Sequence, residues 1–454
     1  MEFITSERSK TLLVFEGFKF SFQKLLKGDV ERWICCTKSC KCSVKLINNR
    51  TDLLEKLNDH NHERIEKKLL NRQKLSNSLK RKATADISTR PRKLICSELR
   101  NSDVDTLDAS DLNLIRHNMH RARLARHPTL PKSIEETQNA IKNMDIQTNT
   151  GEFFLLVNDE ETKIIMFSTV SNLQLLCDSQ RVFMDGTFKS CPKFYFQVFT
   201  LLGLKNNVYI PLVFLLLPGK TKSIYKQAFQ HVKSQCSSLV GKEFYPSEVF
   251  ADFELAIHGA IQDVWSDVIR RGCRFHLGQS WWRKIQTSGL ANTYNDKESE
   301  ESEFLKYFFG LPFLDPEDVF DCFTDDLMSI QPSQNEKICE FTDYILENYI
   351  LPDSPFPPDL WAKYSEDLTR TTNSCESYHS KLNSAFYIAH PNIYNFIDVL
   401  LDFQCEVYVK SRSSRPRINV KEKFVKQEMS KLEEKQIDRF QFVKRVSYKF
   451  LPKV

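Results

Sequence analysis

The stretches Arg181-Val-Phe-Met-Asp185-Gly-Thr-Phe188 and Ser247-Glu-Val-Phe-Ala-Asp252-Phe-Glu254 decide the fold class of this chain. In each stretch, a run of β-prone apolar residues leads directly into an aspartate. We therefore expect Asp185 and Asp252 each to lie at or near the end of a buried strand.

Two further β-rich runs, residues 194–204 and 208–218, lie between the two aspartates, and a helical stretch follows over about residues 224–239. The order strand, strand, strand, helix, strand, helix is typical of α/β domains in which helices cover a mixed sheet. It is similar to the order of a ribonuclease-H-like core. A hairpin over residues 151–168 is expected to extend the sheet before Asp185.

A pair of carboxylates at the ends of neighbouring strands has a chemical use. The two acids can ligate Mg²⁺ or Mn²⁺ against a phosphodiester, which stabilises both the attacking and the leaving oxygen. The alternative is structural, because an aspartate followed by a glycine is commonly a turn residue. For Asp185 taken alone, the turn is the favoured interpretation.

Three motifs further along the chain favour the metal-site interpretation of the two aspartates. They are Gly272-Cys273-Arg-Phe-His276, Gln279-Ser-Trp281-Trp282-Arg283-Lys284 and Arg370-Thr-Thr-Asn373-Ser-Cys-Glu376-Ser-Tyr-His379. In combination they resemble the Mutator-like element (MULE) transposase family over about residues 95–410. The resemblance implies a catalytic triad of Asp185, Asp252 and Glu376 that holds Mg²⁺ or Mn²⁺ and cuts and joins DNA strands. An α-helical insertion, about residues 302–351, is expected between Asp252 and Glu376.

Several residues near the triad are expected to support the acids or to contact DNA: Cys273, His276, Asn373, His379, Trp281, Trp282, Arg283 and Lys284. Indole rings can stack on bases, and the neighbouring cations can hold phosphates. Alternatives stay open for both groups. The cysteine and histidine at 273 and 276 fit a buried structural pair comparably well, and paired tryptophans are more often part of a helix core.

The amino-terminal segment, residues 1–63, has short strand-like runs and is too small for much of a core. It contains Cys35-Cys36-Thr-Lys-Ser-Cys40-Lys-Cys42 and, after another strand-like run, Asp59-His60-Asn-His62. A structural Zn²⁺ ion held by Cys35, Cys40, His60 and His62 would supply the missing stability. Cys36 and Cys42 stay open as substitutes for the two cysteine ligands.

The ligand order, Cys-x₄-Cys followed by His-x-His, resembles the FLYWCH-type zinc finger, with Phe3, Leu12 and Trp33 also on its pattern. The resemblance implies that the finger binds DNA or a protein partner, and the residues do not separate these two.

The segment after the finger is strongly basic, with eleven basic and two acidic residues between Arg64 and Lys93. Residues 64–94 are expected to be an exposed helix that fades into a linker. Lys80, Arg81 and Lys82, with the basic cluster at 90–93, indicate a nuclear-import signal or an arm that contacts phosphates. The alternative is a solvated charge run.

Residues 95–150 contain apolar residues at helical spacing with arginines around them: Arg116, Arg121, Arg123 and Arg126. A second helix is expected to begin at Ser133, where Glu136 has capping-box spacing. Two short helices joined by a proline-containing turn could be a helix-turn-helix-like DNA reader. An amphipathic pair packed on the core is the equal alternative.

The size and composition of the chain set broad limits. It has 454 residues, of which 41% are hydrophobic, so about three units are expected, with residues 411–454 as a basic tail. Its 13 cysteines, without a signal peptide, indicate reduced thiols or metal ligands in a soluble intracellular protein. No apolar run is long enough to cross a bilayer.

These features favour a nuclear DNA transposase that uses Zn²⁺ structurally and Mg²⁺ or Mn²⁺ catalytically. Its expected partners are the terminal repeats of its element and target DNA, without a membrane or a small-molecule substrate, and a homo-oligomer stays open. The alternative is a domesticated zinc-finger DNA-binding regulator that keeps the fold and no longer transposes.

Overall fold

The computed structural model describes residues 1–6, 10–47, 49–86, 89–100, 104–125, 129–206, 208–332, 335–365, 373–386, 388–412 and 420–452, without the side chains of residues 373–376. The chain forms two compact units. One covers Met1–Leu130 together with Ala385–Tyr387, and the other covers Pro131–Ser384 and Ile388–Val454. Among the described helices, none is both long enough and apolar enough to span a bilayer.

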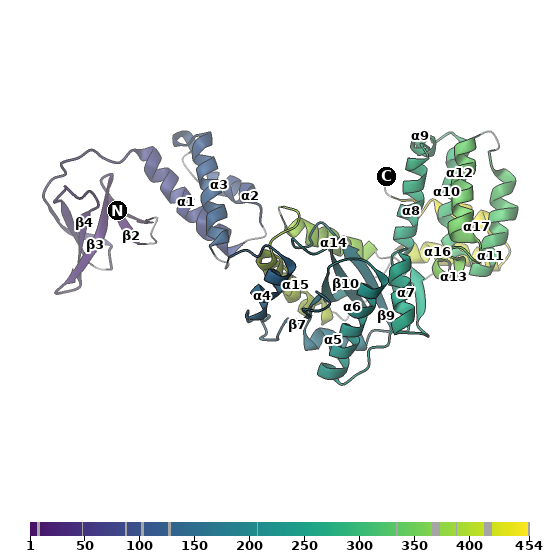
Figure 1. Cartoon of the computed structure of the whole chain (residues 1–454). Helices are drawn as coiled ribbons and strands as arrows, with labels where there is room; N and C mark the ends of the chain where they lie inside the picture. Colours follow the sequence, from purple (N-terminus) through teal and green to yellow (C-terminus); the bar gives the residue numbers. More distant parts are fainter. Residues whose placement is uncertain are drawn as a thin grey trace. The chain divides into compact units, whose positions relative to one another are not determined.

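The first unit begins with an antiparallel sheet whose strands follow one another in sequence order (Figure 1). Its strands are β1 (Glu2–Thr5), β2 (Thr11–Phe15), β3 (Phe18–Leu26), β4 (Val30–Cys35), β5 (Ser43–Ile47) and β6 (Asp52–Leu57). Glu16 and Gly17 have φ values of 51° and 82°, as a two-residue hairpin turn requires. Phe20 and Trp33 are fully buried, but the cluster around them is small.

The rest of the first unit is helical, with α1 (Lys67–Ala85), α2 (Pro91–Leu99), the single turn η1 (Val104–Thr106) and α3 (Ala109–Leu124). In place of the exposed helix and linker expected at 64–94, α1 buries Leu75 and Leu79 against Ile115 and Met119 of α3. The apolar residues of α1 are few but share one face, which is enough to dock the helix on a neighbour.

The contact between α1 and α3 also carries a buried charge. Asp111, 1% exposed, accepts a hydrogen bond from Nη1 of Arg72 at 2.9 Å, and Nζ of Lys68 lies 3.6 Å from its other oxygen. The same aspartate completes a capping box with Asp108 at the start of α3. The second of the two helices expected at 95–150, α4 (Ile134–Lys142), belongs to the other unit, so α3 pairs with α1 instead.

The second unit is built on a mixed sheet with the order β13-β12-β9-β10-β11-β8-β7. Its strands are β7 (Leu155–Asn158), β8 (Ile165–Phe167), β9 (Arg181–Thr187), β10 (Gln197–Lys205), β11 (Val208–Leu217), β12 (Glu248–Ala251) and β13 (Ile269–Gly272). Strands β9, β10 and β11 are antiparallel, whereas β12 runs parallel to β9 and β13 runs parallel to β12. The mixed α/β sheet predicted from the sequence is confirmed.

The two faces of this sheet have separate cores, because successive side chains of a strand point to opposite faces. Val182 and Met184 of β9 pack in a core with α5 (Val170–Cys177), α6 (Lys222–Gln235) and α7 (Leu255–Val264). Phe183 stacks on Phe250 of β12 in a different cluster. By this alternation, Asp185 shares the face of Phe183.

Helices α14 (Asn373–Ala385) and α15 (Ile393–Ser411) also pack on the sheet (Figure 1). The ring of Tyr378 in α14 lies 6.1 Å from that of Phe214, and the ring of Phe396 in α15 lies 6.2 Å from that of Phe167. These contacts bring the segment that carries Glu376 onto the same sheet as the two aspartates.

A helical body follows β13 and shares one large apolar core. Its elements are α8 (Arg274–Thr287), α9 (Ala291–Asn295), α10 (Glu300–Tyr307), η3 (Phe308–Phe313), α11 (Pro316–Asp321), η4 (Cys322–Leu327), η5 (Met328–Ile330), α12 (Glu336–Ile345), η6 (Leu346–Ile350), α13 (Pro358–Trp361), α16 (Val420–Glu433) and α17 (Arg439–Ser447). It therefore extends beyond the insertion expected at about 302–351.

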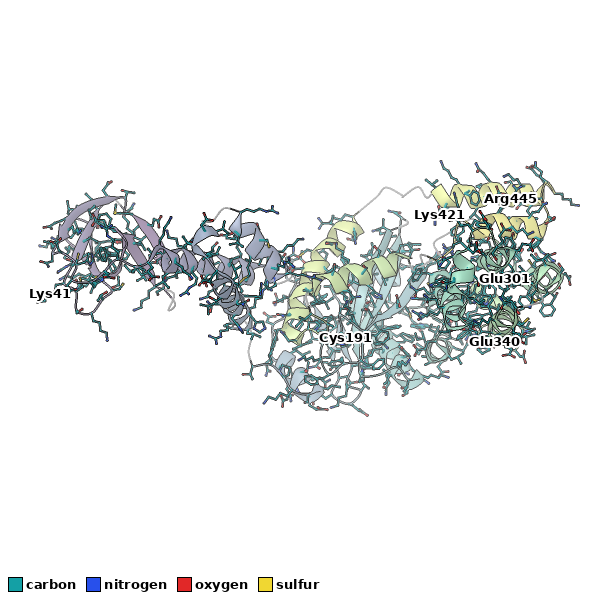
Figure 2. All side chains as sticks on the ribbon, turned by 90° about the horizontal axis from the view of Figure 1, so that it is seen from above. Lys41, Cys191, Glu301, Glu340, Lys421 and Arg445 are labelled. Carbon is teal, nitrogen blue, oxygen red and sulfur yellow. The ribbon has the colours of Figure 1, made fainter. Side chains whose placement is uncertain are left out.

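The region expected as a basic tail, 411–454, supplies α16 and α17 to this body (Figure 2). The carbonyl oxygen of Val443 would lie 2.3 Å from a Cβ at Gly310. Helix α17 therefore packs against η3 at a distance that leaves room for glycine but not for a larger residue at position 310. Glu428 of α16 is 4% exposed and binds Nζ of Lys431 at 2.5 Å and Nη1 of Arg445 at 3.2 Å. The basic composition belongs to the outer faces of two docked helices.

Candidate zinc site and candidate active site

Four side chains of the first unit converge as metal ligands would. Sγ of Cys35 lies 3.2 Å from Nε2 of His62, and Sγ of Cys40 lies 3.4 Å from Nδ1 of His60. The two ring nitrogens are 3.3 Å apart, and all four ligand atoms lie within 4.8 Å of one another. This is the donor set and the spacing that a tetrahedral Zn²⁺ site requires.

The surroundings of Cys40 and of the two histidines favour the forms that bind metal, whereas burial raises the pKa of the Cys35 thiol. Burial opposes ionisation of Cys40, but the backbone N–H groups of Cys42 and Asn61 bond to its sulfur and lower its pKa. Burial, with the neighbouring His62, also lowers the pKa of His60, which favours the neutral imidazole. Nδ1 of His62 lies 3.0 Å from the carbonyl oxygen of Glu63, so it carries the proton and leaves Nε2 for the metal.

This geometry brings together the two cysteines and the two histidines that the sequence analysis selected. Cys36 is exposed and Cys42 is buried nearby, but neither belongs to the cluster of ligand atoms. Phe18 stacks on His60 with a centroid distance of 3.5 Å and fixes the plane of its ring. The residues therefore fit a structural zinc ion.

Asp185 and Asp252 lie on neighbouring parallel strands, as the sequence predicts. Asp185 is inside β9, and Asp252 directly follows β12, which pairs with β9 through Phe250 and Phe183. The turn interpretation of Asp185 does not apply, because Gly186 continues the strand opposite Phe199. A Cβ at Gly186 would lie 2.2 Å from Oε1 of Gln197, so close approach explains this glycine.

Each aspartate is held by its own backbone. Oδ1 of Asp185 accepts a hydrogen bond from the N–H of Gly186 at 2.8 Å, and Oδ1 of Asp252 accepts one from the N–H of Phe253 at 2.7 Å. The side chain of Asp185 is 7% exposed, whereas that of Asp252 is 46% exposed. One carboxylate is thus enclosed and the other opens to solvent.

Two histidines predicted near the triad contact these carboxylates. Nδ1 of His379 lies 3.1 Å from Oδ2 of Asp185. Nδ1 of His276 lies 3.5 Å from Oδ1 of Asp252, and its Nε2 lies 4.0 Å from Oδ1 of Asp185. The imidazole of His276 therefore lies between the two acids.

The charge of His276 follows from its neighbours. Burial disfavours the imidazolium, but Cys273, Asp252 and Asp185 together favour it more strongly and raise the pKa of His276 to about 10. Cys273 itself is fully buried at the start of α8. The Cys-x₂-His motif thus acts as one group that places a positive charge beside two acids.

Glu376 and Asn373 lie in α14, but their side chains are outside the described residues. Glu376 precedes His379 by three positions, and residues three apart occupy the same side of a helix. The contact between His379 and Asp185 thus holds the helix of Glu376 at the sheet.

Sequence reasoning missed His258 in this neighbourhood. Burial lowers the pKa of His258 to about 4, so it is neutral, and its Nε2 bonds to the carbonyl oxygen of Asp252 at 2.9 Å. It fixes the backbone that carries the second aspartate. The available signal was one histidine within the apolar run Leu255–Ile261 of helix α7.

The paired tryptophans do not form a surface on which bases could stack. Trp281 is fully buried between Phe309, Tyr349 and Trp361, so its ring is unavailable to DNA and the core alternative holds. Trp282 is 9% exposed and packs on Tyr294. Arg283 bonds to Gln279 at 3.3 Å, and Nζ of Lys284 lies over Tyr344, 5.2 Å from the ring centre.

The basic residues predicted to bind DNA divide into two groups. Arg116, Arg121 and Arg81 are exposed, Lys80 is half-buried, and Lys82 pairs with Glu98, whereas Arg126 lies outside the described residues. Arg123 is 3% exposed and donates to three carbonyl oxygens, those of Ala83, Asp86 and Thr89, at 2.7 to 2.9 Å. Arg123 therefore holds the end of α1 and is not a surface cation.

Comparisons with known families agree with both candidate sites. Residues 3–62 match the FLYWCH zinc finger domain, and residues 181–280 match the MULE transposase domain. The second match includes both aspartates and the Cys-x₂-His motif, and it ends before α14. No curated protein matches the chain. The two matches indicate a transposase-like DNA-binding protein, and the chain carries a FLYWCH zinc finger domain and a MULE transposase domain.

Proposed function

We propose that the protein is a DNA transposase of the Mutator-like class. The zinc finger and the exposed arginines of α3 bind the ends of the element, and Asp185, Asp252 and Glu376 form the site that cuts and joins strands. The proposal places the protein in the nucleus, where its DNA substrates lie.

The strand order supports this proposal. Three antiparallel strands, β9, β10 and β11, are followed by two strands that add in parallel on the other side of β9. This is the arrangement expected of a ribonuclease-H-like core, in which the central and the adjacent parallel strand each carry an acid. Asp185 lies in β9, and Asp252 directly follows β12.

The observation that carries the proposal is the contact between His379 and Asp185 at 3.1 Å. It joins strand β9 to α14, the helix that contains Glu376. This contact supports a site in which Glu376, three positions before His379 in the same helix, joins the two aspartates.

The donor set fits a divalent cation. Carboxylate oxygens are the ligands that Mg²⁺ and Mn²⁺ prefer, and Asp252 remains open to solvent beside the enclosed Asp185. When bound, such ions would stabilise charge on the attacking and leaving oxygens of the phosphodiester. The residues of this chain position that site: Gly186 and His379 orient Asp185, and Phe253 orients Asp252.

The positive His276 has a role that does not depend on the metal. Its ring lies between two carboxylates that would repel each other, so it lowers the cost of holding them together in the free protein.

A cleavage assay on the terminal inverted repeats that flank the coding sequence tests the proposal. We expect Mg²⁺-dependent nicking and strand transfer by the wild type, and a loss of about a thousandfold or more in Asp185→Asn, because a metal ligand is removed. The exposed Asp178→Asn, at the C-terminal end of α5 in the same unit, is the matched control, and it should cut normally. Specific DNA binding without nicking by the wild type would instead identify a DNA-binding regulator.

A further inference from the structure

A groove beside the two acids is lined by cations and aromatic rings. Its volume is about 880 Å³, and it lies between α8, α14, the start of α16 and the chain after α17. The residues that give it its chemical character are Arg274, Arg283, Lys381, Lys421, Phe275 and Trp282. No carboxylate lines it in the part of the chain that the structure describes.

Two of the four cations lack an acidic partner among the described residues. The guanidinium of Arg274 lies between two rings, 5.3 Å from the centre of Phe313 and 4.5 Å from that of Phe450, and its buried Nε has no hydrogen-bond partner there. Arg283 bonds only to the neutral Gln279. By contrast, Lys381 is paired with Glu406.

Lys421 adds a third positive charge to the groove. Its Nζ lies 5.0 Å from the centre of Phe450 and donates to the carbonyl oxygen of Lys449 at 3.1 Å, and these contacts hold it in the wall of the groove. Positive charges held by rings and carbonyl groups leave a site that suits an anion.

The opposite wall consists of hydroxyl groups on α14. Ser377, Ser380 and Ser384 line the groove from positions three and four apart, so they follow one side of the helix. Ser377 and Ser380 are exposed. Hydroxyl groups bond readily to phosphate oxygens.

The groove and the candidate active site share two helices. Phe275 and Gln279 of α8 line the groove, and Nδ1 of His276 in the same helix lies 3.5 Å from Oδ1 of Asp252. Ser380 of α14 lines the groove, and Nδ1 of the preceding residue, His379, lies 3.1 Å from Oδ2 of Asp185. Both walls of the groove therefore belong to helices that also contact the two carboxylates.

We propose that this groove binds a single DNA strand and leads it to Asp185 and Asp252, an inference that deepens the proposed function and rests on it. The spaced cations and hydroxyl groups bind successive phosphates, and Phe275 contacts the bases. Base faces are available to aromatic side chains only where the bases are unpaired. The occupant is accordingly an unpaired end and not a continuous duplex.

Photo-crosslinking of the full chain tests this inference. The probe is an oligothymidylate of about 8 nucleotides, within the range that single-strand sites occupy, with one 5-iodouracil, and crosslinked peptides are identified by mass spectrometry. We expect crosslinks at Phe275, reduced by an unlabelled single strand and not by a duplex of equal length. Crosslinks confined to residues outside the groove, or equal competition by duplex, would overturn the proposal.

Two variants and a control separate the groove from the other basic surfaces. We expect Arg283→Gln, which removes one phosphate contact, and Ser380→Asp, which places a carboxylate in the groove without disturbing packing, each to reduce the crosslink yield about tenfold at low salt. Lys297→Gln removes an exposed cation of the same helical body outside the groove, so its yield should stay at the wild-type level. An unchanged yield in both groove variants contradicts the inference.

The result is distinguishable from failure of the proposed function. Groove crosslinks without Mg²⁺-dependent nicking would support the proposed binding site and contradict the proposed transposase activity. Nicking that depends on Asp185 but is unaffected by both groove variants would contradict the proposed binding site and support the proposed transposase activity.

Discussion

The imidazole of His379 in α14 lies 3.1 Å from the carboxylate of Asp185 in β9, although 194 positions separate the two residues. This contact joins strand β9 to the helix that contains Glu376. It orients the enclosed aspartate. It also holds the helix that contains Glu376, the third acid of the proposed site, against the sheet.

The His379 contact predicts that two similar substitutions of His379 affect cleavage activity to different extents. If Nδ1–H of His379 orients Asp185, His379→Asn should retain most Mg²⁺-dependent cleavage, because the Asn amide can donate from a similar position, whereas His379→Gln should lose about ten- to a hundredfold. The measurement is kcat for nicking at saturating Mg²⁺, with far-UV circular dichroism to show that both variants fold. Equal loss in the two variants would assign His379 a packing role only.

Zinc removal should unfold the finger alone. We expect about one zinc per chain, lost in Cys35→Ser and kept in Cys36→Ser, because only the first sulfur belongs to the cluster of ligands. Metal content and hydrogen exchange of β2 to β5 measure the effect. The sheet of the second unit should keep its protection, and zinc retained by a double variant Cys35→Ser, His62→Ala would refute the ligand assignment.

Substitutions of Arg123 and Arg121 should have different effects on stability and on DNA binding, although the two residues are near neighbours in α3. Arg123→Gln removes donors from three backbone carbonyls and should destabilise the α1–α3 pair by about 3 kcal/mol. The exposed Arg121→Gln should change stability by less than about 0.5 kcal/mol and instead weaken DNA binding. Hydrogen exchange of α1 and α3 and a DNA titration report the two effects, and identical behaviour of the two variants would argue against this division.

Glu428 makes the stability of the helical body depend on pH. Burial disfavours its charge, but Lys431 and Arg445 lower its pKa below the usual value, so the folded state binds its proton less readily than the unfolded state. Its contribution is therefore complete above the unfolded pKa of about 4.3 and is lost as pH falls through the lower folded pKa.

The matching experiment compares Glu428→Gln with the wild type in urea. At neutral pH we expect a loss of about 1 to 2 kcal/mol, since one partner of a buried charge network is removed, and this difference should shrink below about pH 4. Glu434→Gln, an exposed change in the same segment, should have little effect at any pH. A Glu428 effect that does not change with pH would show that its charge is not the cause.

The zinc ligands and the two aspartates could be predicted because spacing and strand pattern define them locally. Cys35, Cys40, His60 and His62 follow a short motif, and Asp185 and Asp252 follow recognisable strands. The buried role of Arg123 could not be predicted, because nothing in its neighbourhood separates an arginine that binds carbonyl groups from one that faces DNA.

Long-range packing explains the other differences. The tail was predicted from its charge, although Phe442, Val443 and Val446 of α17 lie at helical spacing and are fully buried in the helical body. Trp281 is core because α8 is enclosed by helices that come later in the chain. The contact of His379 with Asp185 depends on where α14 packs, which sequence spacing does not determine.

The central claim is that acids from β9, β12 and α14 share one divalent-metal site. Fe²⁺ can replace Mg²⁺ in such a site, and with ascorbate and peroxide it generates radicals that cut the polypeptide near the metal. The account predicts cuts close to Asp185, Asp252 and Glu376 that excess Mg²⁺ suppresses and that Asp185→Asn abolishes. Cuts near the two aspartates with none in α14, or no cuts at all, would contradict it.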